Sequence, residues 1–215
     1  MAVTPFLDTS VLVAGLIDFG PQSAPAQSIL HGVAEKTITS AATAWHCCLE
    51  FYSVATRLPA EYRLSPPDAC RLVEEEILGR LVVHDLPSAA RRDFFRAAAE
   101  DATAGGRIYD AHIAEVARRA GASVVVTDNR RHFLAALRHG LRVETPLEFL
   151  RSLKEKGQDR FNGPCTRPPP GRDPRGPTPA PRRWSASHAS CCRRRETGNR
   201  IARYRSACSH SRHCR

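Results

Sequence analysis

Residues 109–129 have the sequence YDAHIAEVARRAGASVVVTDN, and this stretch decides the fold class. Its first half repeats apolar residues at the spacing of one helix face, and the repeat stops at Gly121, a residue type that commonly ends helices. Residues 123–126 then form a short, mostly β-branched run of the kind that parallel sheets bury on both faces. The stretch therefore predicts a helix followed by a buried strand. The repeating residues are Ile113, Val116, Ala117 and Ala120.

Two carboxylates border this helix and strand. Asp110 falls in the first turn of the predicted helix, where the helix dipole favours a negative charge. Asp128 lies at the carboxyl end of the predicted strand, and open α/β sheets bind their ligands at that end of their strands. Two acids presented in this way are candidate metal ligands.

The first 153 residues continue this alternation of short apolar strands and helices. The alternation indicates a parallel sheet covered on both faces, and we expect a three-layer α/β/α sandwich with four or five strands. The predicted strands are 6–7, 37–39, 81–83, 123–126 and 141–143. A first helix is predicted to begin at residues 11–13. Further helices are predicted over 27–34, 42–58, 66–79, 88–103, 109–120, 130–138 and 146–154. The helix over 42–58 carries Trp45, Leu49 and Tyr52 on one face, with Glu50 off that face.

Charge divides the chain into two parts. Residues 1–155 hold 17 basic and 19 acidic residues, whereas residues 156–215 hold 15 and 3, so the pI of about 9.7 describes the tail. Nucleic-acid binding by the whole domain does not follow from that pI. Prolines and arginines replace apolar periodicity after residue 157. We expect one α/β domain of ordinary size over residues 1–153 and a disordered tail rich in Arg, Pro, Ser and Cys over residues 154–215.

The compartment follows from what the sequence lacks. Asp8 interrupts the only apolar start, so we expect no secretory signal, and no apolar run approaches the ~20 residues that cross a bilayer. Five of the eight cysteines lie in the tail, and we interpret Cys47, Cys48 and Cys70 as small buried apolar groups. These features indicate a cytoplasmic protein with no membrane partner.

Four carboxylates occupy positions that such a sheet can bring together. Asp8 ends the first strand, Glu50 lies in the helix after the second strand, Asp110 opens a helix, and Asp128 ends the fourth strand. If the first and fourth strands are neighbours, Asp8 and Asp128 converge at one edge. Four uncompensated carboxylates raise one another's pKa values, and a divalent cation that prefers oxygen ligands, Mg²⁺ or Mn²⁺, removes that conflict.

Each acid also has a purely structural explanation. Asp8 can cap the helix that follows it, and Asp110 can offset the helix dipole. Glu50 can be a solvated helix residue, and Asp128 can start a turn. Only the joint placement of the four favours a shared site.

Other polar residues give weaker signals. Three arginines flank the acids, where they could hold a phosphate backbone or lie on a solvated helix face. They are Arg107, Arg130 and Arg131. The histidines of the domain show no paired ligand spacing, and we interpret them as surface or partly buried side chains. They are His46, His84, His112, His132 and His139.

Four blocks of the sequence resemble the motifs of PIN-domain ribonucleases. They are Phe6–Ser10, Leu49–Ser53, Tyr109–Ala114 and Val126–Phe133, and their order and spacing match that family over about residues 1–153. Within the family the chain is most similar to the VapC toxins of bacterial toxin–antitoxin pairs. The tail departs from the pattern of such toxins.

The resemblance implies that Asp8, Glu50, Asp110 and Asp128 form the acidic metal-binding set. It implies Thr9 and Thr127 as supporting residues, RNA as the substrate and a homodimer as the assembly. It also implies inhibition by a small VapB-type antitoxin that plugs the groove.

We therefore expect a Mg²⁺-dependent endoribonuclease, with Mn²⁺ as an alternative ion. Asp8 and Asp110 are the expected main ligands, while Glu50 and Asp128 bind through water or hold a second ion. The ion would activate a water for in-line attack on the RNA phosphodiester and stabilise charge on the leaving oxygen.

Two other functions compete with this one. A PIN-like module could bind RNA or an antitoxin without significant turnover, although four intact acids disfavour that function. A phosphotransfer protein would need a second acid close to Asp8 or a lysine after a late strand. Asp8 is followed by Thr9, and no lysine lies between Lys36 and Lys154, so this second function is disfavoured as well.

Overall fold

The protein folds around a parallel sheet of five strands in the order β3-β2-β1-β4-β5. The structure is a computed structural model that describes residues 4–133, 137 and 140–159. Each neighbouring pair of strands is parallel, so the predicted parallel α/β architecture is confirmed. The strands are β1 (Pro5–Leu7), β2 (Ala42–Ala44), β3 (Val82–His84), β4 (Val124–Val126) and β5 (Arg142–Glu144).

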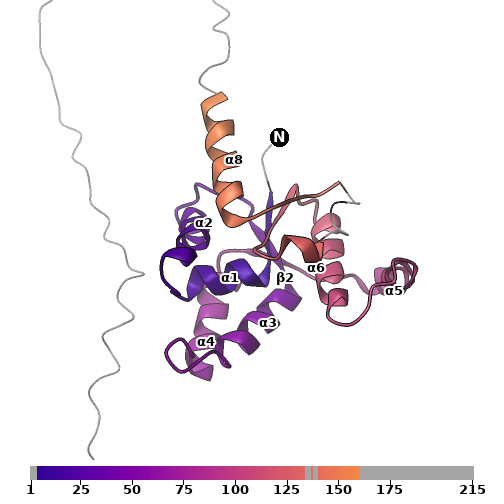
Figure 1. Ribbon diagram of the computed structural model, residues 1–215, viewed down its shortest axis with the longest axis horizontal. Coiled ribbons are helices and arrows are strands. Elements are labelled where there is room, and N and C mark those ends of the chain that lie inside the picture. The colour runs from indigo at the N-terminus through magenta and orange to yellow at the C-terminus, as the bar shows by residue number, and fades with distance from the viewer. Residues whose placement is uncertain (1–3, 134–136, 138–139, 160–215) are drawn as a thin grey trace, which may run out of the picture. The chain divides into compact units, whose positions relative to one another are not determined.

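Helices cover both faces of this sheet, and Figure 1 shows α1 and α6 on opposite sides of the strands. The chain runs from β1 to β2 and β3 in one direction, and then crosses back to β4 and β5. Because crossovers between parallel strands are right-handed, this reversal sends the later helices to the other face. The helices are α1 (Thr9–Leu16), α2 (Ala24–Ala34), α3 (Trp45–Ala55), α4 (Pro66–Leu72), α5 (Arg91–Glu100), α6 (Arg107–Arg119) and α8 (Pro146–Asp159), with short turns η1 (Pro21–Ser23), η2 (Val73–Leu78), η3 (Ser88–Ala90) and η4 (Arg130–Phe133).

The order in which the chain adds strands to the sheet reverses between β1 and β4. These strands are hydrogen-bonded neighbours with Leu7 opposite Val126, and the backbone N–H of Asp8 donates to the carbonyl of Val126 at 3.1 Å. At such a point the loops that leave adjacent strands diverge to opposite faces and leave a crevice at the carboxyl edge of the sheet. The condition for Asp8 and Asp128 to converge is therefore met.

The stretch over 109–129 folds as its pattern predicts. α6 begins at Arg107, two residues earlier than expected, and Gly121 ends it with a φ of +69°, a conformation that glycine adopts without strain. All three residues of β4 are completely buried. The residues that α6 buries against the sheet are Ile113, Ala114, Val116 and Ala117.

The strand predicted at residues 37–39 is wrong. Lys36 and Ser40 have positive φ angles of 57° and 59°, so the backbone bends at both ends of this segment. The two N–H groups after Lys36 both donate to the carbonyl of Gly32, at 2.9 and 3.0 Å, which closes the end of α2. The second strand is instead β2, whose three small residues are all buried.

The helix predicted over 42–58 is wrong at its start, because its first three residues form β2, and α3 ends at Ala55. Its large apolar face points outward, with Trp45, Leu49 and Tyr52 exposed by 44%, 53% and 39%. The core instead receives the opposite face of α3, which consists of Cys47, Cys48, Phe51 and Ala55.

The remaining elements differ from prediction mainly at their ends. The helix predicted over 66–79 is α4 followed by one π-helical turn, η2, and the helix over 88–103 is η3 followed by α5. Of the helix predicted over 130–138 the structure gives the turn η4, and most of the rest lies outside the described residues. α8 extends to Asp159, past the expected domain boundary at residue 153, and the predicted tail beyond it also lies outside the described residues. No helix in the described part is long and apolar enough to cross a membrane.

Candidate metal centre

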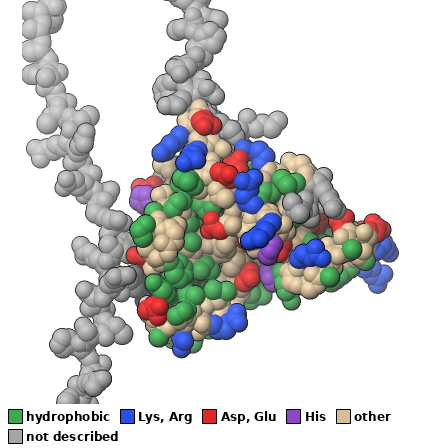
Figure 2. All heavy atoms as spheres, in the orientation of Figure 1, with side chains coloured by type: hydrophobic (Ala, Val, Ile, Leu, Met, Phe, Trp, Pro, Cys, Tyr) green, Lys and Arg blue, Asp and Glu red, His purple; other side chains and the backbone are tan. Residues whose placement is uncertain are grey.

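The four predicted acids come from four elements that meet at the carboxyl edge of the sheet. Asp8 follows β1, Asp128 follows the neighbouring strand β4, Glu50 lies on α3, and Asp110 lies in the first turn of α6. Electrostatic influence links them: the charge of Asp8 raises the pKa of both Asp110 and Asp128, and that of Glu50 raises the pKa of Asp110. On the face shown in Figure 2, acidic and histidine side chains lie next to one another near the middle of the molecule.

Asp8 is the buried centre of this group, with 6% of the residue exposed. Its Oδ2 accepts hydrogen bonds from the hydroxyls of Ser10 and Thr127, both at 2.8 Å, and a long one from the backbone N–H of Ser10 at 3.5 Å. The last contact makes Asp8 the N-cap of α1, so the structural explanation of this residue is confirmed, and its role as a metal ligand stays a prediction. Burial raises the pKa of Asp8, and these hydrogen bonds oppose that shift because they favour the charged form.

Glu50 is tied to the same strand end by Thr9. The Thr9 hydroxyl donates to Glu50 Oε2 at 2.6 Å, across 41 positions of sequence. Because Thr9 directly follows Asp8, this contact places the carboxylate of α3 beside the start of α1. The two threonines that the resemblance implied as supporting residues thus each hold one of the acids.

Asp110 has a pKa raised to about 6, mainly because burial penalises its charged form. The charges of Asp8 and Glu50 raise it further, whereas those of His132 and His46 lower it. His132 Nδ1 lies 3.4 Å from Asp110 Oδ2. The same ring nitrogen lies 2.6 Å from the side-chain nitrogen of Asn129, one residue beyond Asp128.

Asp128 is the most exposed of the four acids. Burial and the charge of Asp8 raise its pKa. Its backbone N–H donates to the Ser10 hydroxyl at 3.1 Å, and that same hydroxyl donates to Asp8. Ser10 therefore bridges the loops that follow β1 and β4.

The donor chemistry of these carboxylates, rather than a preformed cluster, suits a hard divalent cation. Across residues 4–133, 137 and 140–159, no group of three or more His, Cys, Asp or Glu side chains is arranged so that it could hold a metal ion. What the site offers is oxygen donors that share an unfavourable negative charge, which is the donor chemistry that Mg²⁺ and Mn²⁺ prefer. These two ions also keep several water ligands, so they do not require a dedicated cage of side chains.

Sequence reasoning missed three contributors to this site. Ser10 entered only as the last residue of the block Phe6–Ser10, and His46 and His132 only as surface or partly buried residues. The available signal was spacing, because His46 stands one helical turn before Glu50 and His132 four residues after Asp128.

The structure decides between the two explanations of the flanking arginines for one of them. Arg130 pairs with Glu148 at 2.8 Å, and Arg107 donates to the carbonyl of Ala102 at 3.4 Å. Arg131 is exposed. Among the three, Arg130 has its charge balanced on the surface, which favours the solvated face for that residue.

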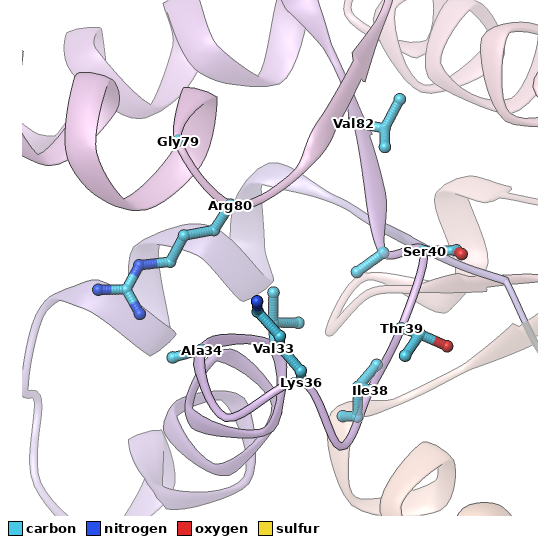
Figure 3. A pocket seen from close by; sticks show the side chains of 10 residues that line it. Val33, Ala34, Lys36, Ile38, Thr39, Ser40, Gly79, Arg80 and Val82 are labelled. Atoms are coloured by element: carbon cyan, nitrogen blue, oxygen red, sulfur yellow. The ribbon is translucent and has the colours of Figure 1, made fainter.

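A pocket of roughly 450 Å³ lies elsewhere, where α2 ends and β2 and β3 begin (Figure 3). Its lining includes Lys36, Ile38, Ser40, Arg80 and Val82. Because the acids follow the carboxyl ends of strands and this pocket adjoins the amino ends, the two lie at opposite edges of the sheet. The pocket is not part of the acidic site.

Asp8, Glu50, Asp110 and Asp128 together form what we call the acidic edge. The parallel α/β fold and this edge lead to a class of protein. The family model of the PIN domain matches residues 6–137, and the chain belongs to this family. It is 38% identical over 90 residues to ribonuclease VapC27 of Mycobacterium tuberculosis, a match that spans 42% of this chain and 64% of that relative.

The comparison with solved structures gives matches of low identity. A crystal structure of FitAcB from Neisseria gonorrhoeae has 20% identity and a TM-score of 0.47, over 67% of this chain and 99% of the other. The structure of PAE2754 from Pyrobaculum aerophilum has 22% identity and a TM-score of 0.48, over 72% of this chain and 99% of the other.

Proposed function

We propose that this protein is a metal-dependent endoribonuclease and the toxin of a toxin–antitoxin pair. The observation that carries the proposal is the acidic edge: Asp8 and Asp128 follow neighbouring parallel strands, and the Ser10 hydroxyl contacts both residues. Burial raises the pKa of Asp110 and of Asp128, and the charge of Asp8 adds to both shifts. A conflict among charges of this kind costs folding stability, and it is typical of sites that bind a cation. The similarity to ribonuclease VapC27 supports RNA as the substrate.

Each acid has a proposed role. Asp8 and Asp110 would hold Mg²⁺ or Mn²⁺ directly, and Glu50 and Asp128 would bind through water or hold a second ion. Such an ion lowers the pKa of water and stabilises negative charge on the oxygens of an in-line phosphoryl displacement.

The chain's own residues prepare this site. The hydroxyls of Ser10 and Thr127 favour the ionised form of Asp8 against the effect of burial and fix its orientation, because both donate to the same carboxylate oxygen. The hydroxyl of Thr9 orients Glu50. His132 stands beside Asp110, where its positive form offsets negative charge.

We propose that the protein forms a homodimer, that a VapB-type antitoxin inhibits it, and that it encounters both RNA and antitoxin in the cytoplasm. The exposed face of α3 supports an antitoxin site. Trp45, Leu49 and Tyr52 form an apolar row, and exposed rows of this kind are typical of protein interfaces. Because Leu49 directly precedes Glu50, a segment packed on this row reaches the acidic edge, and basic residues on that segment would complement the carboxylates.

The test is to map RNA 5′ ends in cells after brief induction of the protein. We expect new ends at a small set of sites with the wild type and with Asp93→Asn, a matched acid on α5 that pairs with nearby Arg96. Asp8→Asn should give none. Equal 5′ ends with Asp8→Asn would contradict the proposal, and RNA bound but never cut by the wild type would favour a binding module.

A further inference from the structure

We propose that the stacked rings of His46 and Tyr109 form a platform on which an unpaired RNA base stacks beside the acidic edge. This inference rests on RNA being the substrate, as proposed above, and it adds the class of RNA segment and the residues that hold it. The platform belongs to α3 and α6, the two helices that carry Glu50 and Asp110.

The two rings are arranged as a stack that remains open to solvent. Their centroids lie 5.0 Å apart with an angle of 10° between the ring planes. His46 covers one face of the tyrosine ring, yet Tyr109 is 55% exposed. A large aromatic ring held in a fixed orientation at the surface presents area that a planar ligand can cover.

The platform adjoins the proposed chemistry. Tyr109 directly precedes Asp110, and His46 lies one helical turn before Glu50 on the same helix. A base stacked here would therefore belong to a nucleotide near the phosphate that the proposed ion would hold at the acids.

Further aromatic rings contact the platform edge-on. His112 meets His46 edge-on at 5.9 Å and 71°, and Phe94 meets His112 edge-on at 5.7 Å and 81°. This row of rings extends from α5 through α6 to α3. Because the rings are already held in place, less ordering is needed when a ligand binds.

The chemistry of stacking defines the occupant. An aromatic side chain stacks on the face of any base and contributes about 1–3 kcal/mol per base. Only a base outside a duplex offers both of its faces, so the site suits loops, bulges or ends of RNA rather than paired segments. We expect little discrimination among bases from this contact alone.

The competing explanation is that the rings only hold α3 and α6 together. Tyr109→Leu separates the two roles, because leucine keeps apolar bulk between the helices but offers no aromatic face, whereas Tyr109→Phe keeps the face. Phe95→Ala is a matched control, since Phe95 is an aromatic side chain of α5 with 64% exposure whose ring contact is with Phe94, at 5.4 Å, and not with His46 or Tyr109. Melting temperatures of all variants report the structural role.

The probe is a short single-stranded oligouridylate carrying one 2-aminopurine, whose fluorescence falls when the base stacks on an aromatic ring. Binding is measured with the full chain in Ca²⁺, and cleavage of the same RNA is followed in parallel in Mg²⁺. We expect quenching with the wild type, Tyr109→Phe and Phe95→Ala. Tyr109→Leu should lose the quenching and bind about tenfold more weakly.

Persistent quenching in Tyr109→Leu, or wild-type binding without quenching at any position of the 2-aminopurine, would overturn the platform. Loss of quenching together with a large fall in melting temperature would also overturn it, in favour of the structural role. Cleavage without quenching contradicts the platform alone, whereas quenching without cleavage contradicts only the ribonuclease activity. A wild type that binds no RNA contradicts both.

Discussion

The hydroxyl of Thr127 donates a 2.8 Å hydrogen bond to Oδ2 of Asp8, across 119 positions of sequence. This contact joins the residue after β4 to the residue after β1, at the point where the order of strands along the sheet reverses. Both residues are buried, so the hydroxyl stabilises a carboxylate that water does not reach freely. The contact therefore connects the sheet topology to the charge state of the acidic edge.

Replacing Thr127 by valine keeps the shape of the side chain but removes the donor. We expect a loss of about 1–3 kcal/mol in the free energy of unfolding, because the buried carboxylate loses a partner. The pKa of Asp8 should rise further, so more Mg²⁺ should be needed for half-maximal cleavage. Thr56→Val, which removes a surface contact at the end of α3, is the control. Urea unfolding and Mg²⁺ titration of the two variants measure both effects, and equal behaviour would contradict this role.

Metal ions should stabilise the folded protein. If the acids bind one site, Mg²⁺ or Mn²⁺ at a hundredfold excess over Kd adds about 2.7 kcal/mol to the free energy of unfolding. Asp128→Asn should raise the melting temperature of the metal-free protein, because it removes a charge that Asp8 repels, and should weaken the effect of the ion. Thermal melts with EDTA or metal measure this. A melting temperature indifferent to both ions in both proteins speaks against a shared site.

The metal-free protein should lose stability as the pH rises from about 4 to 6. Asp110 has a pKa of about 6 in the folded protein against 3.8 for an ordinary aspartate, so the folded state binds more protons in this range. Its stabilising contribution is complete below 3.8 and disappears as the pH rises through 6. Urea unfolding in EDTA should show this slope in the wild type and a smaller one in Asp110→Asn. Identical slopes would show that Asp110 titrates normally.

The tail after α8 is proposed to be dispensable for catalysis. Residues 156–215 carry 15 basic and 3 acidic residues, so they should attract RNA phosphates in a strongly salt-dependent manner. A chain that ends after residue 159 should keep the cleavage sites of the full chain. It should lose only weak RNA affinity at low salt. Cleavage mapping and binding across a salt series test this, and altered cleavage sites would assign the tail a function.

Much of the fold could be predicted because its elements have strong apolar patterns. β4 is three consecutive valines, and α6 repeats apolar residues at helical spacing, so both were found. β2 was missed because Ala42–Ala44 lacks the bulky side chains that mark strands, and only its burial between β1 and β3 makes it one. The β-branched run Thr37-Ile38-Thr39 was misleading. The N–H groups of Thr37 and Ile38 donate to the carbonyl of Gly32, so this segment forms a turn that closes the end of α2.

The four acids could be proposed from sequence because Asp8 and Asp128 end strands, Asp110 stands near a helix start, and Glu50 lies in the helix after the second strand. The contacts that organise them could not, since they depend on the register between β1 and β4. Ser10 bridges Asp8 and Asp128 only because Leu7 lies opposite Val126. The outward direction of Trp45 on α3 was equally hidden, because the opposite face of that helix is also apolar.

The most direct test of the account is RNA cleavage by the purified full chain in Mg²⁺, with Asp8→Asn and Asp110→Asn beside Asp93→Asn. Asparagine keeps the shape of the aspartate but removes the charge that would hold the ion. We predict that both site variants lose cleavage by orders of magnitude while their circular dichroism stays that of the wild type, and that Asp93→Asn cleaves normally. RNase activity that survives in Asp8→Asn and Asp110→Asn, after contaminating nucleases are removed, would contradict the acidic edge as the catalytic centre.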